Sequence, residues 1–185
     1  MPDNLVGIAA CASNALELDY HLEEFIKWHA PKVDKLIINV DSRSTDDTYP
    51  VLQYLKKYIN NLEVFTSDWG ERTVKDWLGK AKFEAFTRLD TRWRILLDVD
   101  EFLFRWSNDS IDIRSKIQRL NPFQLHAVLY HHFVGSYKTV GTTPQWPNKQ
   151  WRIACTDDPE IYKHTLIDSS GSNLIGVEPN QYPDL

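Results

Sequence analysis

Three carboxylates stand close together in the middle of the chain. Asp98, Asp100 and Glu101 follow the apolar run Ile95-Leu96-Leu97, and apolar residues resume at Phe102. A short apolar run bounded by charge is typical of a buried strand, so the acids are expected at its carboxyl end. If the chain bends there, Asp98 and Asp100 approach one point, where their repulsion favours a bound cation. Mg²⁺ or Mn²⁺ suits such oxygens and completes its shell with substrate phosphate, although a solvated acidic turn explains the tripeptide alone.

The elements before these acids alternate between strands and helices. Apolar runs predict strands at residues 5–11, 35–40 and 62–66, and apolar residues at helical spacing predict helices near 19–29, 48–59 and 74–89. This alternation predicts an α/β fold with a mostly parallel, twisted sheet, right-handed crossovers and flanking helices. Ligands of such sheets bind at the carboxyl edge.

Small or acidic residues end three of the predicted strands. Ala10 and Cys11 end the first strand, Asp41 ends the second, and Asp98 ends the fourth. Their agreement predicts a ligand site at one edge of the sheet. The acids Asp46 and Asp47, further along the segment after Asp41, are interpreted as helix caps.

The third predicted helix begins with a basic stretch. The side chains either form a solvated face or meet phosphates near the helix N-terminus, where the dipole favours anions. The residues concerned are Arg72, Lys75, Lys80 and Lys82.

Composition bounds the possible functions. The chain has 185 residues, of which 42% are hydrophobic, enough for one domain with a sizeable core. Its net charge of −5 argues against a general nucleic-acid binder. Its two cysteines suggest neither a disulfide framework nor zinc. No signal peptide or membrane-spanning run is visible, so a cytoplasmic location is expected.

The alternation weakens beyond residue 104. We expect a helix at 111–120 capped by Asp109 or Ser110, a strand at 126–133 and a short strand at 151–155. The segment from residue 169 is predicted to be loop or tail.

Four segments, taken in order, resemble the inverting family-2 glycosyltransferases of the GT-A fold. The resemblance is closest to the subgroup whose fourth strand ends in Asp-x-Asp-Glu-Phe. It implies one GT-A domain over residues 1–185, with a nucleotide-binding half at 1–104 and an acceptor and catalytic half at 105–185. The chain is short for this fold, so the acceptor region is either minimal or supplied by another part of a longer polypeptide. The matching segments are residues 5–14, 20–28, 41–48 (Asp-x-x-Ser-Thr-Asp-Asp-Thr) and 93–103.

The resemblance also implies a reaction. Such enzymes move a sugar from a nucleoside-diphosphate sugar, most commonly a UDP-sugar, to a hydroxyl of a glycan or glycoconjugate. Mn²⁺ or Mg²⁺ stabilises the leaving diphosphate as a Lewis acid. Asp98 and Val99 would face the nucleotide, Asp98 and Asp100 the metal, and His164 would be a further metal ligand.

The same resemblance assigns the remaining roles. Ala10, Cys11 and Asp41 would hold the nucleotide base. A later carboxylate would deprotonate the acceptor hydroxyl, and Asp158 is favoured, with Asp157 beside it. Glu160 and Asp168 remain alternatives for this base. The chain has Ala15 where family members often have Glu, so one acid near the nucleotide is missing.

Two other functions compete with this interpretation. The missing acid and the short second half suit a nucleotide-sugar-binding module without catalysis. Asp-x-Asp after an apolar strand also opens the haloacid-dehalogenase-type phosphatases, but there Gly-Thr follows on the first strand. Here Glu101-Phe102 follows, on the fourth. Assays of sugar-donor hydrolysis with Mn²⁺ and of aryl phosphate hydrolysis with Mg²⁺ distinguish the glycosyltransferase from these two alternatives.

Overall fold

The chain alternates strands and helices as far as its fourth strand. A computed structural model describes residues 4–70, 77–103, 112–120, 126–129 and 149–155. The strands are β1 (Val6–Ala12), β2 (Lys35–Asp41), β3 (Leu62–Ser67), β4 (Trp93–Leu96), β5 (His126–Leu129) and β6 (Lys149–Cys155). The helices are α1 (Leu22–His29), the 3₁₀ turn η1 (Ala30–Lys32), α2 (Thr48–Leu55), α3 (Trp77–Thr87) and α4 (Ile113–Ile117).

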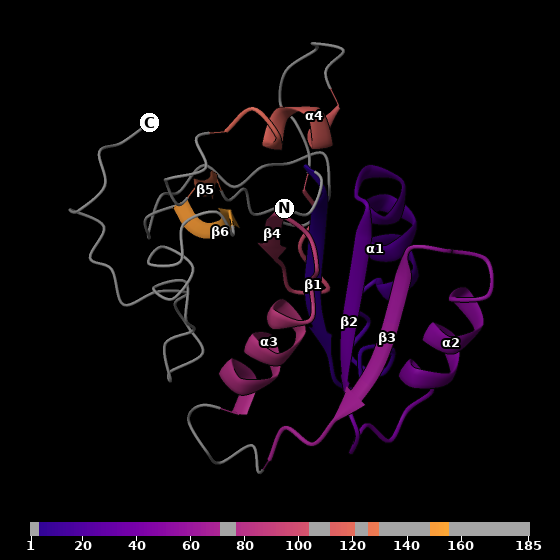
Figure 1. The fold of residues 1–185 in the computed structure, drawn as a ribbon. Coiled ribbons are helices and arrows are strands. Elements are labelled where there is room, and N and C mark those ends of the chain that lie inside the picture. Colours follow the sequence, from indigo (N-terminus) through magenta and orange to yellow (C-terminus); the bar gives the residue numbers. More distant parts are fainter. Residues whose placement is uncertain (1–3, 71–76, 104–111, 121–125, 130–148, 156–185) are drawn as a thin grey trace, which may run out of the picture.

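The strands form one mixed sheet in the order β3-β2-β1-β4-β6-β5 (Figure 1). Strands β1 to β4 are parallel, whereas β6 runs antiparallel to both β4 and β5. The predicted fold class, an α/β fold with a mostly parallel sheet flanked by helices, is confirmed. Among the described residues no helix has both the length and the apolar character needed to cross a membrane.

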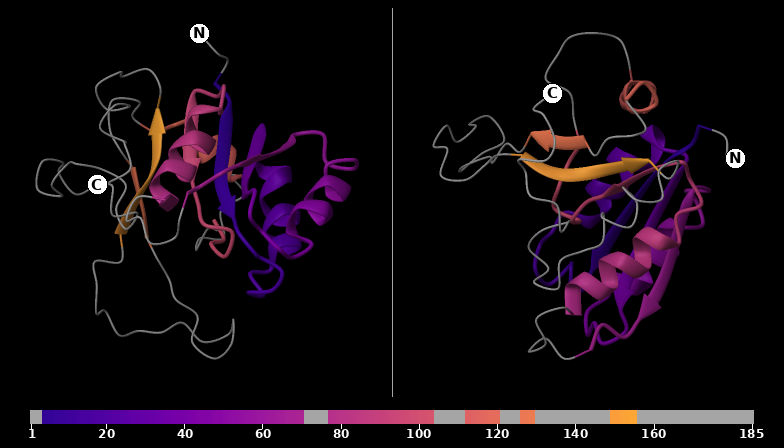
Figure 2. Two further views of the ribbon diagram at one scale, coloured as in Figure 1. Left: turned by 90° about the horizontal axis from the view of Figure 1, so that it is seen from below. Right: turned by 60° about the vertical axis from the view of Figure 1, so that its left-hand side comes forward.

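Helices cover both faces of the parallel part of the sheet (Figure 2). Side chains of a strand alternate between the two faces. Ile8 and Ala10 of β1 therefore join the core beneath α1 and α2. Ala9 and Cys11 join the core beneath α3. Both cores are continuous up to the carboxyl edge, which gives the residues there a rigid base.

Gly7 marks a close approach between β1 and the segment that leads from α3 to β4. A Cβ atom at this position would lie 2.6 Å from both Leu89 Cδ2 and Thr91 Oγ1. The absence of a side chain therefore lets Leu89 and Thr91 pack directly on the strand.

The predicted starts of two helices are wrong. Helix α1 begins at Leu22, not near residue 19, because Asp19 and His21 have φ values of 54° and 49°, which an α-helix does not allow. Helix α4 begins after Asp112, whose Oδ1 accepts a 2.9 Å hydrogen bond from the Ser115 amide, so the cap is neither Asp109 nor Ser110.

Candidate functional site

The strand order places a switch point between β1 and β4. After β1 the chain builds β2 and β3 on one side, and it then returns to β4 on the other side of β1. Helix α1, which follows β1, and helix α3, which precedes β4, pack on opposite faces. In open α/β sheets, ligands bind outside the carboxyl ends of strands at such a point.

Asp41 lies at the end of β2, next to this point, and its carboxylate is held on several sides. The side chain is 2% exposed. Its Oδ1 accepts hydrogen bonds from the Arg43 amide (3.1 Å) and from Arg43 Nε (3.2 Å). Its Oδ2 accepts from Arg43 Nη2 (3.3 Å) and from Ser13 Oγ (3.5 Å). Asp41 is thus held mainly by Arg43, with one longer contact to Ser13 in the loop after β1.

The acids after β4 form a closed turn. The Asp98 amide donates to Glu101 Oε2 (2.9 Å), and the Glu101 amide donates to the Asp98 carbonyl (2.9 Å). Val99 is buried and Asp100 is exposed within this turn. The turn is therefore closed by two hydrogen bonds between Asp98 and Glu101 and leaves Asp100 exposed to solvent.

Lys82 of α3 pairs with Asp98. Its Nζ lies 2.6 Å from Asp98 Oδ1, and the lysine is 5% exposed overall. Asn39 of β2 fixes this part of α3, because its Nδ2 donates to the Ala81 carbonyl (3.1 Å) while its Oδ1 accepts from Ser67 Oγ (2.9 Å). The position of Asp98 therefore depends on α3 as well as on β4.

Ala10 and Cys11, predicted to contact the nucleotide base, have buried side chains. Burial raises the pKa of the Cys11 thiol far above its ordinary value; Lys82 opposes this shift, and Asp98 adds to it. The thiol is therefore protonated at neutral pH. Ligand contact at these two positions has to come through the backbone.

The acidic segment after β2 anchors the loop after β1. Asp46 Oδ2 accepts hydrogen bonds from the amides of Leu16 (2.9 Å) and Glu17 (3.0 Å), and its Oδ1 accepts from the Thr48 amide (3.0 Å). Thr48 Oγ1 in turn accepts from the Ala15 amide (2.9 Å). Capping is thus only part of the role of Asp46.

Asp47 and Ala15 lie next to these hydrogen-bonded residues. Asp47 occupies the N-cap position of α2 without a side-chain cap hydrogen bond. Ala15 is 1% exposed, so a longer acidic side chain there would have to displace buried neighbours. The packing around Ala15 therefore leaves little room for an acidic side chain at this position.

Of the remaining predicted site residues, Lys80 is exposed on α3. No group of three or more His, Cys, Asp or Glu side chains is arranged to hold a metal ion within the described part of the chain. The other predicted residues lie outside the described residues: Arg72, Lys75, Asp157, Asp158 and His164.

Sequence reasoning missed the roles of four residues near the turn. Glu101 had a usable signal, since Asp98-x-x-Glu101 has the spacing of a reciprocal capping box. Trp28 and His29 gave no signal in the sequence, because Leu103, which their side chains contact, lies 74 or more positions away. Lys82 was recognised only as one member of a basic stretch.

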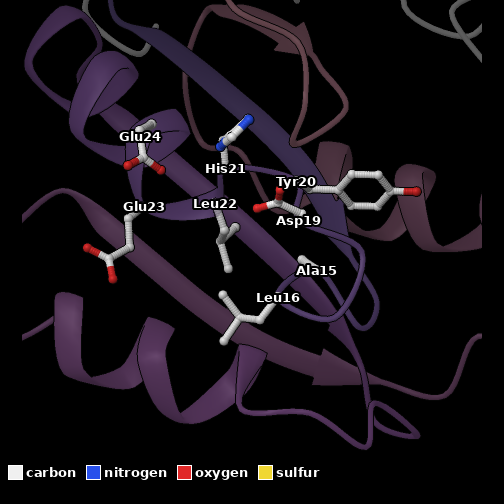
Figure 3. Close-up of a pocket in the computed structure, with 8 residues that line it drawn as sticks. All are labelled: Ala15, Leu16, Asp19, Tyr20, His21, Leu22, Glu23 and Glu24. Atoms are coloured by element: carbon white, nitrogen blue, oxygen red, sulfur yellow. The ribbon is translucent and has the colours of Figure 1, made fainter.

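A pocket of about 300 Å³ lies between the loop after β1 and the start of α1 (Figure 3). Its lining is mostly acidic or polar, and none of the predicted site residues contributes to it. The lining residues are Ala15, Leu16, Asp19, Tyr20, His21, Leu22, Glu23 and Glu24.

Comparisons with known proteins give a partial structural similarity. No protein-family model matches the chain, and no curated protein matches it. A crystal structure of S. aureus TarS residues 1–349 is 22% identical with a TM-score of 0.40, covering 53% of this chain and 28% of that one. The same protein with UDP-GlcNAc is 21% identical with a TM-score of 0.39, covering 53% and 27%. The match spans less than a third of the TarS chain in each case.

Proposed function

We propose that the protein is a metal-dependent glycosyltransferase that moves a sugar from a nucleoside-diphosphate sugar to an acceptor hydroxyl with inversion. The observation that carries the proposal is the turn after β4. It lies at the switch point of the sheet, is closed by Glu101, is braced by Lys82, and exposes Asp100. Switch points of this kind bind nucleotides in other open sheets.

The donor set of the turn fits a hard divalent cation. Mg²⁺ and Mn²⁺ are commonly held by one or two carboxylates, with waters and substrate phosphates completing the shell. Asp100 would supply the outward carboxylate, Asp98 would stand beside it, and His164 would add a ligand from the second half. The metal would supply Lewis acidity to the departing diphosphate.

The rest of the proposed site follows the carboxyl edge. Asp41 would border the nucleotide base, with uridine favoured, and contact it through its backbone, as Ala10 and Cys11 would. Lys80, Arg72 and Lys75 would meet the phosphates. Asp158, or Asp157 next to it, would take the proton of the acceptor hydroxyl. A glycan or glycoconjugate is the proposed acceptor.

The variant Asp100→Ala tests the proposal. Because Asp100 is exposed, its loss should leave the melting temperature nearly unchanged. The affinity for UDP in the presence of Mn²⁺ should fall at least about tenfold, since a metal–carboxylate contact is removed. Isothermal titration calorimetry with UDP, with and without Mn²⁺, measures this.

Asp47→Ala is the matched control, because Asp47 is also an exposed aspartate but lies at α2. An Asp100→Ala variant that keeps its Mn²⁺-dependent UDP affinity would contradict the assignment. If the protein binds a UDP-sugar but neither transfers the sugar to an acceptor nor hydrolyses the donor, the non-catalytic binding module is favoured. Hydrolysis of an aryl phosphate would favour the phosphatase.

A further inference from the structure

Two adjacent side chains of α1 bind the backbone of a single residue beyond the acidic turn. Trp28 Nε1 donates to the Leu103 carbonyl (2.8 Å), and His29 Nε2 accepts from the Leu103 amide (3.0 Å). No strand supplies these hydrogen bonds, so the two side chains take the place of a neighbouring strand at this point. Both the backbone amide and the backbone carbonyl of Leu103 are therefore hydrogen-bonded to side chains of α1.

The imidazole of His29 is suited to accept a hydrogen bond. Its Nδ1 lies 2.9 Å from the Phe25 carbonyl, which can only accept, so Nδ1 carries the proton and Nε2 has a free lone pair. The side chain is fully buried, and burial lowers the pKa of His29 to about 4, against a smaller opposing effect of the Phe25 carbonyl. The ring is therefore neutral, with one fixed tautomer, at neutral pH.

Phe102, the residue between the turn and Leu103, is held by rings from α1. Its centroid lies 5.9 Å from that of His29 in a stacked arrangement and 6.2 Å from that of Phe25 in an edge-on arrangement. Such pairs contribute beyond the apolar area they bury. Two consecutive residues after the turn are thus immobilised against one helix.

The turn is also anchored on its other side. The Leu97 amide donates to the Ala9 carbonyl of β1 (3.0 Å), which continues the ladder beyond β4. Only residues 98–101 lie between these two anchors. Ordering four residues that are fixed at both ends costs less conformational entropy than ordering a free loop.

We propose that Trp28 and His29 are positioning residues that hold the turn 98–101 ready to bind a divalent cation through Asp100. This inference rests on the proposed function, since it assigns the clamp to the same metal. Neither side chain needs to touch the metal. They act through the backbone of Leu103 and the ring of Phe102.

The test uses Trp28→Phe and His29→Leu, each of which removes one hydrogen bond to Leu103 while keeping an apolar side chain. His29→Gln is the conservative partner, because the Gln amide oxygen can accept from the Leu103 amide. Mn²⁺ alone is the probe, and its affinity is measured by electron paramagnetic resonance. The melting temperature of each variant is recorded without metal, and Tyr58→Phe, at an exposed aromatic position in the turn after α2, is the control.

Mn²⁺ should bind about threefold to tenfold more weakly to Trp28→Phe and His29→Leu, in line with the cost of ordering a loosened segment on binding. His29→Gln should recover most of the loss. Exchange of the Glu101 amide, followed by nuclear magnetic resonance, should be faster in the two weakened variants. Since Trp28 is 40% exposed, Trp28→Phe is expected to fold even if His29→Leu does not.

The outcomes distinguish the two proposals. A lower melting temperature with unchanged Mn²⁺ affinity in Trp28→Phe would show that the clamp is merely structural, and would overturn the inference while the proposed function stands. A wild-type chain that binds neither Mn²⁺ nor UDP would overturn both.

Discussion

Lys82 is a buried ammonium group that pairs with Asp98 at the candidate site. Removing a lysine from water is unfavourable unless its charge is paired and hydrogen-bonded. The 2.6 Å contact with Asp98 meets that requirement. The positive charge of Lys82 also reduces the combined charge of the Asp98 and Asp100 carboxylates from −2 to −1. Their full negative charge would repel an incoming diphosphate more strongly.

Replacing Lys82 by Met should therefore destabilise the fold. The carboxylate of Asp98, whose side chain is 37% exposed, would lose its charged donor. We expect the free energy of unfolding to fall by about 1–3 kcal/mol, measured by urea denaturation. Lys80→Met, at an exposed position of the same helix, should change it by less than about 0.5 kcal/mol.

A double-mutant cycle sharpens this prediction. If the pair is the cause, Lys82→Met should cost much less in an Asp98→Asn background than in the wild type. Equal costs in the two backgrounds would assign the loss to packing of the lysine stem instead.

The sequence could indicate the acids of the site but not the lysine that meets them. Lys80 and Lys82 are two residues apart, which places them roughly 200° apart around a helix. Either could face the sheet, because the basic residues of this helix show no clear periodicity. Only the packing of Ala81 and Ala85 against β1 and β2 decides that Lys82 points inward.

At the scale of elements, Asp46 connects the loop after β1 with the start of α2. Asp46→Ala removes the acceptor for the Leu16, Glu17 and Thr48 amides. Because the site is partly exposed, we expect a loss of about 1 kcal/mol in the free energy of unfolding. Asp47→Ala, which removes no cap hydrogen bond, is the control. A similar loss in both variants would contradict the anchoring role.

The contribution of Asp46 should also depend on pH. Burial by itself raises the pKa of Asp46, but the hydrogen bonds from Thr48, Glu17 and Leu16 outweigh it, so the net pKa lies below the ordinary value of 3.8. A carboxylate with a lowered pKa stabilises the fold above its unfolded pKa and loses this effect as the pH falls through its folded pKa. The difference between wild type and Asp46→Ala should therefore be constant near neutral pH. It should shrink below about pH 4.

Local patterns explain why the elements were predicted better than their connections. The apolar periodicity of β1 to β4 and of the first three helices is visible within a few residues. The loop before α1 depends on hydrogen bonds that join positions 29 to 33 apart, such as Ala15 to Thr48 and Glu17 to Asp46. No local rule reports such contacts, so the late start of α1 and the second role of Asp46 were not predictable.

At the scale of the molecule, the sequence predicted a mostly parallel sheet but not that β6 would join it antiparallel to β4. A strand near residues 151–155 was expected without a partner. The structure pairs β6 antiparallel with β4, in a register that places Trp93 opposite Cys155. Strand direction depends on how the intervening chain returns to the sheet, and the residues of β6 do not encode it.

The close packing at Gly7 gives a prediction for the whole core. Gly7→Ala would place a Cβ atom 2.6 Å from Leu89 Cδ2 and Thr91 Oγ1, so one layer of the molecule would have to shift. Overpacking of this kind typically costs about 1–3 kcal/mol, and the free energy of unfolding should fall by that amount in urea denaturation. If steric conflict with Leu89 is the cause, Gly7→Ala should cost less in a Leu89→Ala background; an equal cost would contradict it.

The antiparallel pairing of β6 with β4 also affects how the chain folds during translation. β4 lies inside the finished sheet, but its second neighbour, β6, is translated much later than β1. During that interval the nascent chain carries an unpaired strand edge, the kind of surface through which polypeptides aggregate. A chain released before residue 149 would keep that edge permanently open.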